Sequence, residues 1–275
     1  MAHRSQYKNK FRPQAQAVQA LPRQKRHLGQ NFLISQEPIN TMLSAITITP
    51  DTTVVEIGCG DGILTRAILD SKCKALHVIE IDPDWADRLA DNIHDPRLTI
   101  HNVDALQFDF ASLKKEGERL VLLANLPYVI TFPLFEQFSH NHTLFDDAMV
   151  MIQEEAAERV THSSGRRYGA VSMYLQYYFN FTAYERVPPH FFVPAPKVMS
   201  RLVRFQPRTA LMPITDPTAF WLFVRACFVS PRQTLGNNLR RTKYKWQQLP
   251  EQLLRLRAQQ LDLNNLYKLW EQVGQ

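Results

Sequence analysis

Short apolar runs alternate with amphipathic segments through the first two thirds of the chain. The apolar runs have the length of buried strands and end in glycine or polar residues, and they cover residues 53–58, 75–82, 98–105, 120–128 and 148–153. Apolar residues recur at helical spacing over residues 64–71, 85–93, 132–138 and 154–160. This alternation predicts an α/β fold with a parallel sheet and helices on both of its faces.

The remaining segments predict further elements around this repeat. We expect a helix over 33–48, a helix over 169–179, a proline-rich loop over 187–197, a last strand over 201–207, and amphipathic helices over 218–229 and 250–261. No clear strand pattern follows Pro213. We therefore predict a flexible basic tail (residues 1–25), a sheet domain (26–208) and a small all-α C-terminal domain (209–275).

Charge is distributed unevenly along the chain. Residues 1–26 carry a formal charge of +7, residues 27–206 carry −7, and residues 207–275 carry +6. Clustered positive charge indicates a polyanionic partner, such as a nucleic acid, that the two ends of the chain contact. The alternative is that the basic ends only improve solubility.

Other features of the composition narrow the cellular setting. No apolar run approaches the about 20 residues that a membrane span needs, and the polar N-terminus lacks the apolar core of a signal peptide. The three cysteines, Cys59, Cys73 and Cys227, have no zinc-binding spacing. We expect a cytoplasmic monomer with reduced cysteines, no metal and no membrane association.

Glycines and acids stand where the first three predicted strands end, which is where open α/β sheets bind ligands. Gly58, Gly60 and Gly62 form a G-x-G-x-G turn, a spacing that differs from the dinucleotide fingerprint and suits an adenosyl amino acid. Glu80 can accept hydrogen bonds from ribose hydroxyls, and Asp104 can accept one from an adenine amine. Each feature alone also fits an ordinary turn or a solvated loop, but their order favours an adenosine-containing ligand.

The fourth predicted strand ends in Asn125, Leu126, Pro127 and Tyr128. An exocyclic adenine amine is a weak nucleophile, and the Asn125 side-chain oxygen and the Leu126 carbonyl can accept hydrogen bonds from its two N–H groups. Pro127 fixes the backbone beside them, and Tyr128 can stack on the base. Phe192, in the proline-rich segment, is a candidate for the opposite face of the base, or it packs beneath the loop.

Several motifs in this order resemble one enzyme family. They are HLGQNFL (residues 27–33), EIGCGDGILT (56–65), IEID (79–82), DAL (104–106), NLPY (125–128), FVPAPKVMS (192–200) and QTLGNNL (233–239). From about residue 25 to 240 the chain resembles the small-subunit ribosomal RNA adenine dimethyltransferases of the KsgA type. The resemblance implies a Rossmann-like class I methyltransferase sheet with a small helical domain, and S-adenosyl-L-methionine as cofactor.

The resemblance also implies a substrate and a set of contacts. The substrate would be two adjacent adenines near the 3′ end of small-subunit rRNA, methylated during ribosome assembly. The implied cofactor contacts are Asn31, Leu33, Gly58, Glu80, Asp104 and Asn125, with Gln30 and Gly60 in the same segments. Three positions depart from the family pattern: Cys59 stands where proline is usual, Val129 where asparagine is common, and Glu154 where lysine is more usual.

Three other functions compete with this interpretation. Related resistance enzymes apply the same chemistry to adenine in large-subunit rRNA and share QNFL and an Asn-x-Pro-Tyr loop. A non-catalytic assembly or transcription factor could retain the fold, since fold does not imply function. A dehydrogenase is disfavoured by the glycine spacing.

Overall fold

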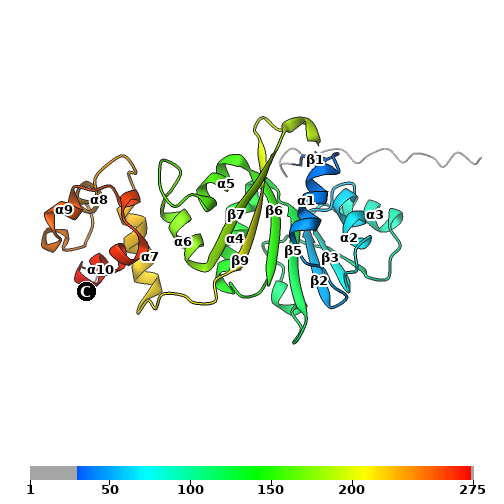
Figure 1. Ribbon diagram of the computed structural model, residues 1–275, viewed down its shortest axis with the longest axis horizontal. Helices are drawn as coiled ribbons and strands as arrows, with labels where there is room; N and C mark the ends of the chain where they lie inside the picture. Colours follow the sequence, from blue (N-terminus) through cyan, green and yellow to red (C-terminus); the bar gives the residue numbers. More distant parts are fainter. Residues whose placement is uncertain (1–29, 274–275) are drawn as a thin grey trace, which may run out of the picture.

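The computed structural model describes residues 30–273 and centres on a seven-stranded sheet (Figure 1). In spatial order the strands are β4 (Leu98–Asn102), β3 (Ala75–Glu80), β2 (Thr52–Ile57), β5 (Arg119–Asn125), β6 (Asp147–Gln153), β9 (Ser200–Pro207) and β7 (Phe179–Val187). The first five are parallel, whereas β9 and β7 pair antiparallel to their neighbours. The predicted α/β fold with a parallel sheet is confirmed for these five strands, and two antiparallel strands extend the sheet at one edge. The predicted tail at residues 1–25 lies outside the described residues.

Burial explains which strands the sequence pattern predicted well. Every residue of β2 is buried, as are most of β5 and β6, so these strands are continuous apolar runs. The edge strand β7 alternates polar with apolar residues and follows the last residue of helix α6 (Ala170–Tyr178) directly. The helix predicted over 169–179 therefore ends one residue too late, and no strand was predicted after it, because helical and strand periods meet there without a turn residue.

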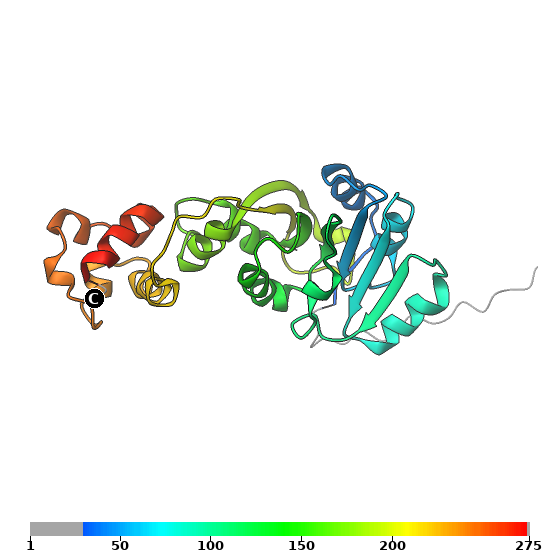
Figure 2. The same cartoon turned by 90° about the horizontal axis from the view of Figure 1, so that it is seen from below.

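Helices cover both faces of the sheet, as expected (Figure 2). They are α1 (Glu37–Ala45), α2 (Ile63–Leu69), α3 (Pro83–Asn92), α4 (Thr131–His140), α5 (Glu154–Thr161) and α6. One apolar cluster contains Phe135 and Ala157 from α4 and α5, and the other contains Met42, Ile68 and Trp85 from α1, α2 and α3. The two clusters lie on opposite faces because successive residues of a strand point to opposite sides.

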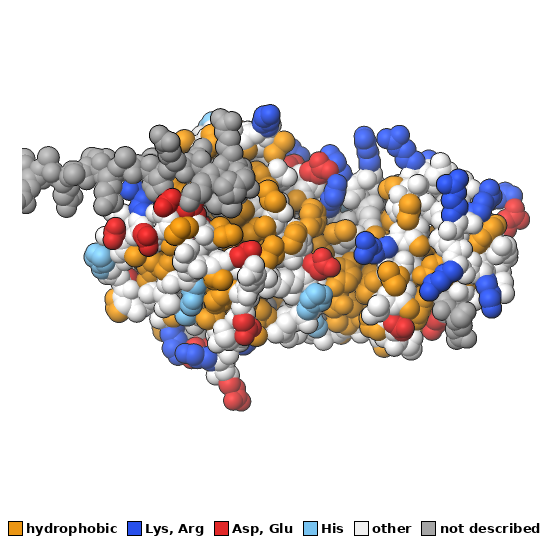
Figure 3. All heavy atoms as spheres, turned by 180° about the vertical axis from the view of Figure 1, so that it is seen from behind, with side chains coloured by type: hydrophobic (Ala, Val, Ile, Leu, Met, Phe, Trp, Pro, Cys, Tyr) orange, Lys and Arg blue, Asp and Glu red, His pale blue; other side chains and the backbone are white. Residues whose placement is uncertain are grey.

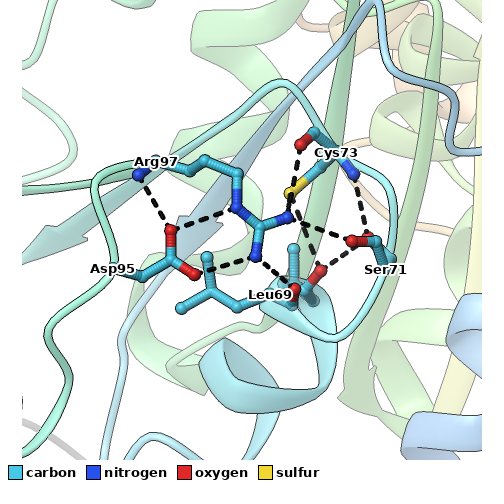
Figure 4. A network of polar contacts seen from close by, with 6 residues as sticks. Leu69, Ser71, Cys73, Asp95 and Arg97 are labelled. Atoms are coloured by element: carbon cyan, nitrogen blue, oxygen red, sulfur yellow. Dashed lines mark hydrogen bonds and ion pairs between the residues drawn. The ribbon is translucent and has the colours of Figure 1, made fainter.

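One arginine joins two turns at the sheet edge (Figure 4). The Arg97 guanidinium donates to the Leu69 carbonyl at 2.5 Å and the Ser71 carbonyl at 3.0 Å, and it pairs with Asp95 at 2.8 Å. These carbonyls lie at the end of α2 and in the turn that leads to β3. The contacts therefore hold the start of β4 against that turn. The network thereby holds the start of the edge strand β4, which leads to Asp104 at its other end.

The C-terminal residues form a helical unit at one end of the molecule (Figures 1 and 2). Its helices are α7 (Pro217–Cys227), α8 (Leu235–Leu239), α9 (Glu251–Leu254) and α10 (Leu263–Val273). The helix predicted over 250–261 is interrupted: α9 covers Glu251–Leu254 and a 3-10 turn covers Ala258–Gln260. The longer helix α10 starts after Asp262, whose side chain accepts from the Asn265 N–H at 2.7 Å. The unit's apolar cluster also includes Tyr168 and Met173 from the sheet part, so the proposed boundary at residue 208 remains a prediction.

A histidine pair at the sheet edge makes stability depend on pH. His77 Nδ1 and His101 Nε2 are 3.0 Å apart, in adjacent strands β3 and β4. Burial lowers the pKa of both imidazoles, and for His77 the charges of His101 and Lys115 lower the pKa further. The unfolded chain, with an ordinary histidine pKa of about 6.5, therefore binds protons before the folded chain does. The stability that the neutral histidine pair contributes is therefore fully present above about pH 6.5 and is lost as the pH falls below that value.

We predict that His101→Gln weakens the pH dependence of stability. The melting temperature of the unmodified protein should fall between about pH 7.5 and pH 5.5, and the melting temperature of the variant should fall less over the same interval. Thermal denaturation followed by circular dichroism measures both curves. His162→Gln, at an exposed histidine, is the control and should keep the original dependence. Parallel curves for the unmodified protein and His101→Gln would contradict this account.

Candidate active site

The predicted site residues gather in one cavity at the carboxyl edge of the parallel strands. The residues that line it include Gln30, Asn31, Leu33, Gly58, Gly60, Glu80, Asp104, Asn125, Leu126, Pro127 and Tyr128. They come from the segments that follow β2, β3, β4 and β5 and from the chain before α1. Parallel pairing brings these strand ends to the same edge although they are far apart in sequence.

The glycine turn after β2 lines the cavity. Gly58 and Gly60 have φ angles of 78° and 51°, which side-chain-bearing residues rarely adopt. The Gly58 N–H donates to the Ile79 carbonyl at 2.9 Å, which ties the turn to the end of β3. A Cβ at Gly60 would lie 2.9 Å from the ring of Phe32, so this ring packs directly on the turn.

Glu80, at the end of β3, is held by backbone donors. It is only 6 % exposed, and its carboxylate accepts from the Cys59 N–H at 3.0 Å and from the Asp82 N–H at 2.9 Å. Burial raises the pKa of Glu80, and these hydrogen bonds partly oppose the rise. A proline at position 59 would have no N–H to donate, so the departure at Cys59 adds a contact to this acid.

Asp104 follows the edge strand β4 and lines the same cavity. Its carboxylate accepts from the Leu106 N–H at 2.9 Å, the geometry of an aspartate turn. The turn fixes the backbone that carries the side chain. The acids predicted at the ends of β3 and β4 therefore both reach the cavity.

The segment after β5 presents hydrogen-bond acceptors at the cavity edge. The Asn125 side-chain amide donates to the Asn31 carbonyl at 3.2 Å, so its Oδ1 is the atom left to accept from a ligand. The Leu126 N–H donates to the Met151 carbonyl at 3.1 Å, and the Ile130 N–H donates to the Pro127 carbonyl at 3.1 Å. These bonds fix the backbone on both sides of the Leu126 carbonyl.

Tyr128 lines the cavity and is anchored at its hydroxyl. Its Oη lies 2.6 Å from the hydroxyl of Ser200, which is fully buried at the start of β9. Burial raises the pKa of Tyr128, and the bond to Ser200 partly offsets this, so the phenol stays protonated at neutral pH. Anchoring one end of the ring limits its rotation and favours a fixed stacking surface.

Of the two positions that the sequence left open for Phe192, the structure shows the packed one. It is 2 % exposed, pairs with Leu33 in the short antiparallel sheet of β1 (Phe32–Leu33) and β8 (Phe192–Val193), and belongs to the apolar cluster on that face. It is not among the residues that line the cavity. The ring therefore packs in the core, and a base cannot reach it in this conformation.

Several lining residues were not among the predicted site residues, and Phe32 and Glu56 are two of them. Phe32 had a signal only through its place in the HLGQNFL motif. Glu56 is a single acid within the apolar run of β2, and such an interruption in a buried strand is itself a signal of function.

The cavity is acidic. Four carboxyl groups line it, those of Glu56, Asp61, Glu80 and Asp104, while no Lys, Arg or His of residues 30–273 does. Opposite charges attract strongly where water is scarce, so the cavity favours a cationic ligand. Within the described residues no group of three or more His, Cys, Asp or Glu side chains is placed to hold a metal ion. No helix there is both long and apolar enough to cross a membrane.

Comparison with known families decides between the candidate functions. The model of the family described as "Ribosomal RNA adenine dimethylase" matches residues 22–266. The chain belongs to the ribosomal RNA adenine dimethylase family. It is therefore an rRNA adenine dimethyltransferase that uses S-adenosyl-L-methionine, a cationic cofactor that suits the acidic cavity.

Relatives of this dimethylase are similar along most of their length. A protein of Acidobacterium capsulatum named "Ribosomal RNA small subunit methyltransferase A" is 34 % identical over 95 % of each chain. A protein of the same name from Laribacter hongkongensis is 40 % identical over 78 % of this chain and 82 % of its own. Among solved structures, a dimethyladenosine transferase from Plasmodium falciparum covers 88 % of this chain and 96 % of its own with a TM-score of 0.70 and 25 % identity. The 23S rRNA methyltransferase ErmE, at 24 % identity, 89 % and 100 % coverage and a TM-score of 0.67, shows the same fold.

We predict that Gly58→Ala weakens cofactor binding in this dimethylase. The added Cβ would strain a residue at φ 78° by about 1–2 kcal/mol and would project between the turn and the segment around Pro127, 3.9 Å away. Calorimetric titration with S-adenosylhomocysteine should show a loss of affinity of roughly tenfold or more. Gly117→Ala is the matched control, because Gly117 has φ 76° and open space around it. Similar affinities in the two variants would refute the role of Gly58.

Proposed function

We propose that the chain dimethylates the exocyclic amines of two adjacent adenines near the 3′ end of small-subunit rRNA during ribosome assembly. The observation that carries the proposal is the Asn125 side chain, whose amide is engaged by Asn31 so that its oxygen is presented at the edge of an acidic cavity. The names of the relatives from Acidobacterium capsulatum and Laribacter hongkongensis support the small subunit as the target.

The lining residues suit each part of S-adenosyl-L-methionine. In this proposal Glu80 accepts from the ribose hydroxyls and Asp104 from the adenine amine of the cofactor. The glycine turn at Gly58 and Gly60 lets the amino-acid part approach the backbone closely, and Gln30, Asn31 and Leu33 close the cavity from the chain before α1. When bound, the cofactor supplies an electrophilic methyl group on a sulfonium.

The segment after β5 prepares the target amine. The Asn125 Oδ1 and the Leu126 carbonyl accept hydrogen bonds from its two N–H groups, which turns the nitrogen lone pair toward the cavity. Tyr128 stacks on the base, an interaction of about 1–3 kcal/mol, and so offsets part of the cost of taking it out of an RNA helix. The amine becomes acidic once it is methylated, so its proton leaves to solvent without a dedicated base.

We further propose that the enzyme acts as a monomer in the cytoplasm. The cysteines Cys59, Cys73 and Cys227 are free and buried, which suits a reducing compartment. Sedimentation of the protein alone and with small subunits measures the oligomeric state.

The substrate is tested with labelled S-adenosylmethionine and undermethylated ribosomal subunits. Label on dimethyladenine of the small subunit, with none on the large subunit in parallel, is the expected result. Label on the large subunit would keep the chemistry and overturn the substrate.

We predict that Asn125→Ala lowers methyl transfer by on the order of 10²-fold or more, since the variant lacks a preorganised hydrogen-bond acceptor for the reacting amine. Binding to the small subunit should stay within a few-fold of the unmodified enzyme, because phosphate contacts carry most of the affinity. Single-turnover transfer and filter binding measure the two effects. Asn92→Ala, at an exposed asparagine on α3, is the control. Near-normal transfer by Asn125→Ala would remove Asn125 from the proposed role.

A basic patch marks the helical unit as part of the RNA footprint. Lys and Arg side chains gather over this end of the molecule (Figure 3). The basic patch consists of Arg240, Arg241, Lys243 and Lys245, all of which are exposed. The Arg240 guanidinium lies 5.9 Å from the ring centre of Trp246 and is thereby held near one position.

We predict that replacing the four residues of the basic patch with glutamine weakens RNA binding and its salt dependence. Each phosphate that the protein no longer neutralises lowers the slope of log affinity against log salt by about 0.7–0.9, so the slope should fall by up to about 3. Binding titrations at several salt concentrations measure it. Lys72→Gln with Lys115→Gln, at exposed positions at the far end of the sheet, is the matched control. An unchanged slope in the patch variant would mean that the patch is only a solvated face.

A further inference from the structure

Glu56 is a buried acid that the chemistry described above does not use. It stands on β2, is 0 % exposed, and lines the cofactor cavity. The Thr65 hydroxyl on α2 donates to its Oε2 at 2.7 Å, whereas its Oε1 has no hydrogen-bond partner within the described part of the chain. A buried carboxyl oxygen without a partner is unfavourable unless the group is neutral or a ligand compensates it.

The groups around Glu56 favour its neutral form while the cavity holds no cation. Burial raises the pKa of Glu56 to about 8, the Thr65 hydroxyl opposes this rise, and the charge of Glu80 on β3 adds to it. The Cys59 thiol in the adjoining turn is also held neutral, since burial raises its pKa. Asp61 and Asp104 add negative charge, and no basic side chain of residues 30–273 lines the cavity.

We propose that Glu56 is a positioning residue that responds to the charge of the bound ligand. It releases its proton when S-adenosylmethionine binds, and it regains a proton after methyl transfer, when the product S-adenosylhomocysteine occupies the cavity. The inference rests on the cofactor assigned above. The two ligands share their amino-acid and adenosine parts, and they differ by the methyl group and by one positive charge at sulfur. Methyl transfer converts the sulfonium to a neutral thioether, and solvent takes up and returns the proton of Glu56.

The consequence is a preference for the cofactor over the product that grows with pH. A ligand that binds only the ionised form gains affinity as the pH rises, by up to about tenfold per pH unit below the pKa of the free group. The affinity for S-adenosylmethionine should therefore rise between about pH 6.5 and pH 8, and that for S-adenosylhomocysteine should change little. Ionised Glu56 would then favour exchange of product for fresh cofactor between the methyl transfers.

The test is calorimetric titration of the full-length protein in buffers with different ionisation enthalpies. The dependence of the binding heat on the buffer gives the number of protons released by each ligand. S-adenosylmethionine should release close to one proton near neutral pH, and S-adenosylhomocysteine far fewer. Sinefungin, which carries an ammonium group in place of the methylsulfonium, should behave as the cationic ligand does.

Three variants test whether the proton released on ligand binding comes from Glu56. Glu56→Gln mimics the protonated acid in size and can still accept from Thr65, so it should bind both ligands without the extra proton release. Thr65→Val removes the hydroxyl that favours the ionised form, so release should shift to higher pH. Glu136→Gln is the matched control, because Glu136 is exposed on α4 and does not line the cavity, and it should keep the proton release.

The outcomes separate this inference from the cofactor assignment. Equal proton release by the two ligands, or unchanged release in Glu56→Gln, would overturn the role of Glu56 and leave the cofactor in place. Failure of the unmodified protein to bind either ligand would overturn the cofactor assignment, and this inference with it.

Discussion

The parallel pairing of β2 with β3 and β5 is the constraint on which the rest of the structure depends. Its register puts Ile57 beside Ile79, so the Gly58 turn and Glu80 emerge at one edge of the sheet. The bond from the Gly58 N–H to the Ile79 carbonyl closes that edge. A one-residue slip would turn the side chains of β2 to the opposite faces of the sheet and would separate the glycine turn from the acids. The apolar clusters on both faces resist such a slip, because β2 is buried along its whole length.

Buried carboxyl groups determine what the cavity accepts. Glu80 keeps two backbone donors and Glu56 has only the Thr65 hydroxyl, so the two acids respond differently to the same burial. In a site with little water, a nearby positive charge acts strongly on both. The sheet supplies this arrangement at little structural cost, because the backbone N–H groups at strand ends have no partner within the sheet and can donate to side chains. The positions of the strand ends thus determine which ligand groups the cavity can bind.

The sequence predicted the site better than it predicted the periphery of the fold. Glu80, Asp104 and Asn125 were found because glycine, acids and amides at the ends of apolar runs have few structural explanations. The strand β7 was missed because its alternating pattern continues from α6 without a turn residue. The sequence left two positions open for Phe192, because an aromatic residue in a loop can face a ligand or the core. Its pairing with Leu33 depends on a contact between segments about 160 residues apart, which periodicity cannot reveal.

The chain before α1 connects the two halves of the site. The Asn31 carbonyl accepts from the side chain of Asn125, 94 residues away, and Phe32 packs on the turn at Gly60. The segment therefore contacts both the glycine turn of the cavity and Asn125, the acceptor that we propose for the target amine. Since the side-chain oxygen of Asn125 is oriented by the bond to Asn31, the acceptor is set before any base arrives. Preorganised acceptors need no rearrangement at the moment of transfer, which is the condition under which a neutral amide can assist a weak nucleophile.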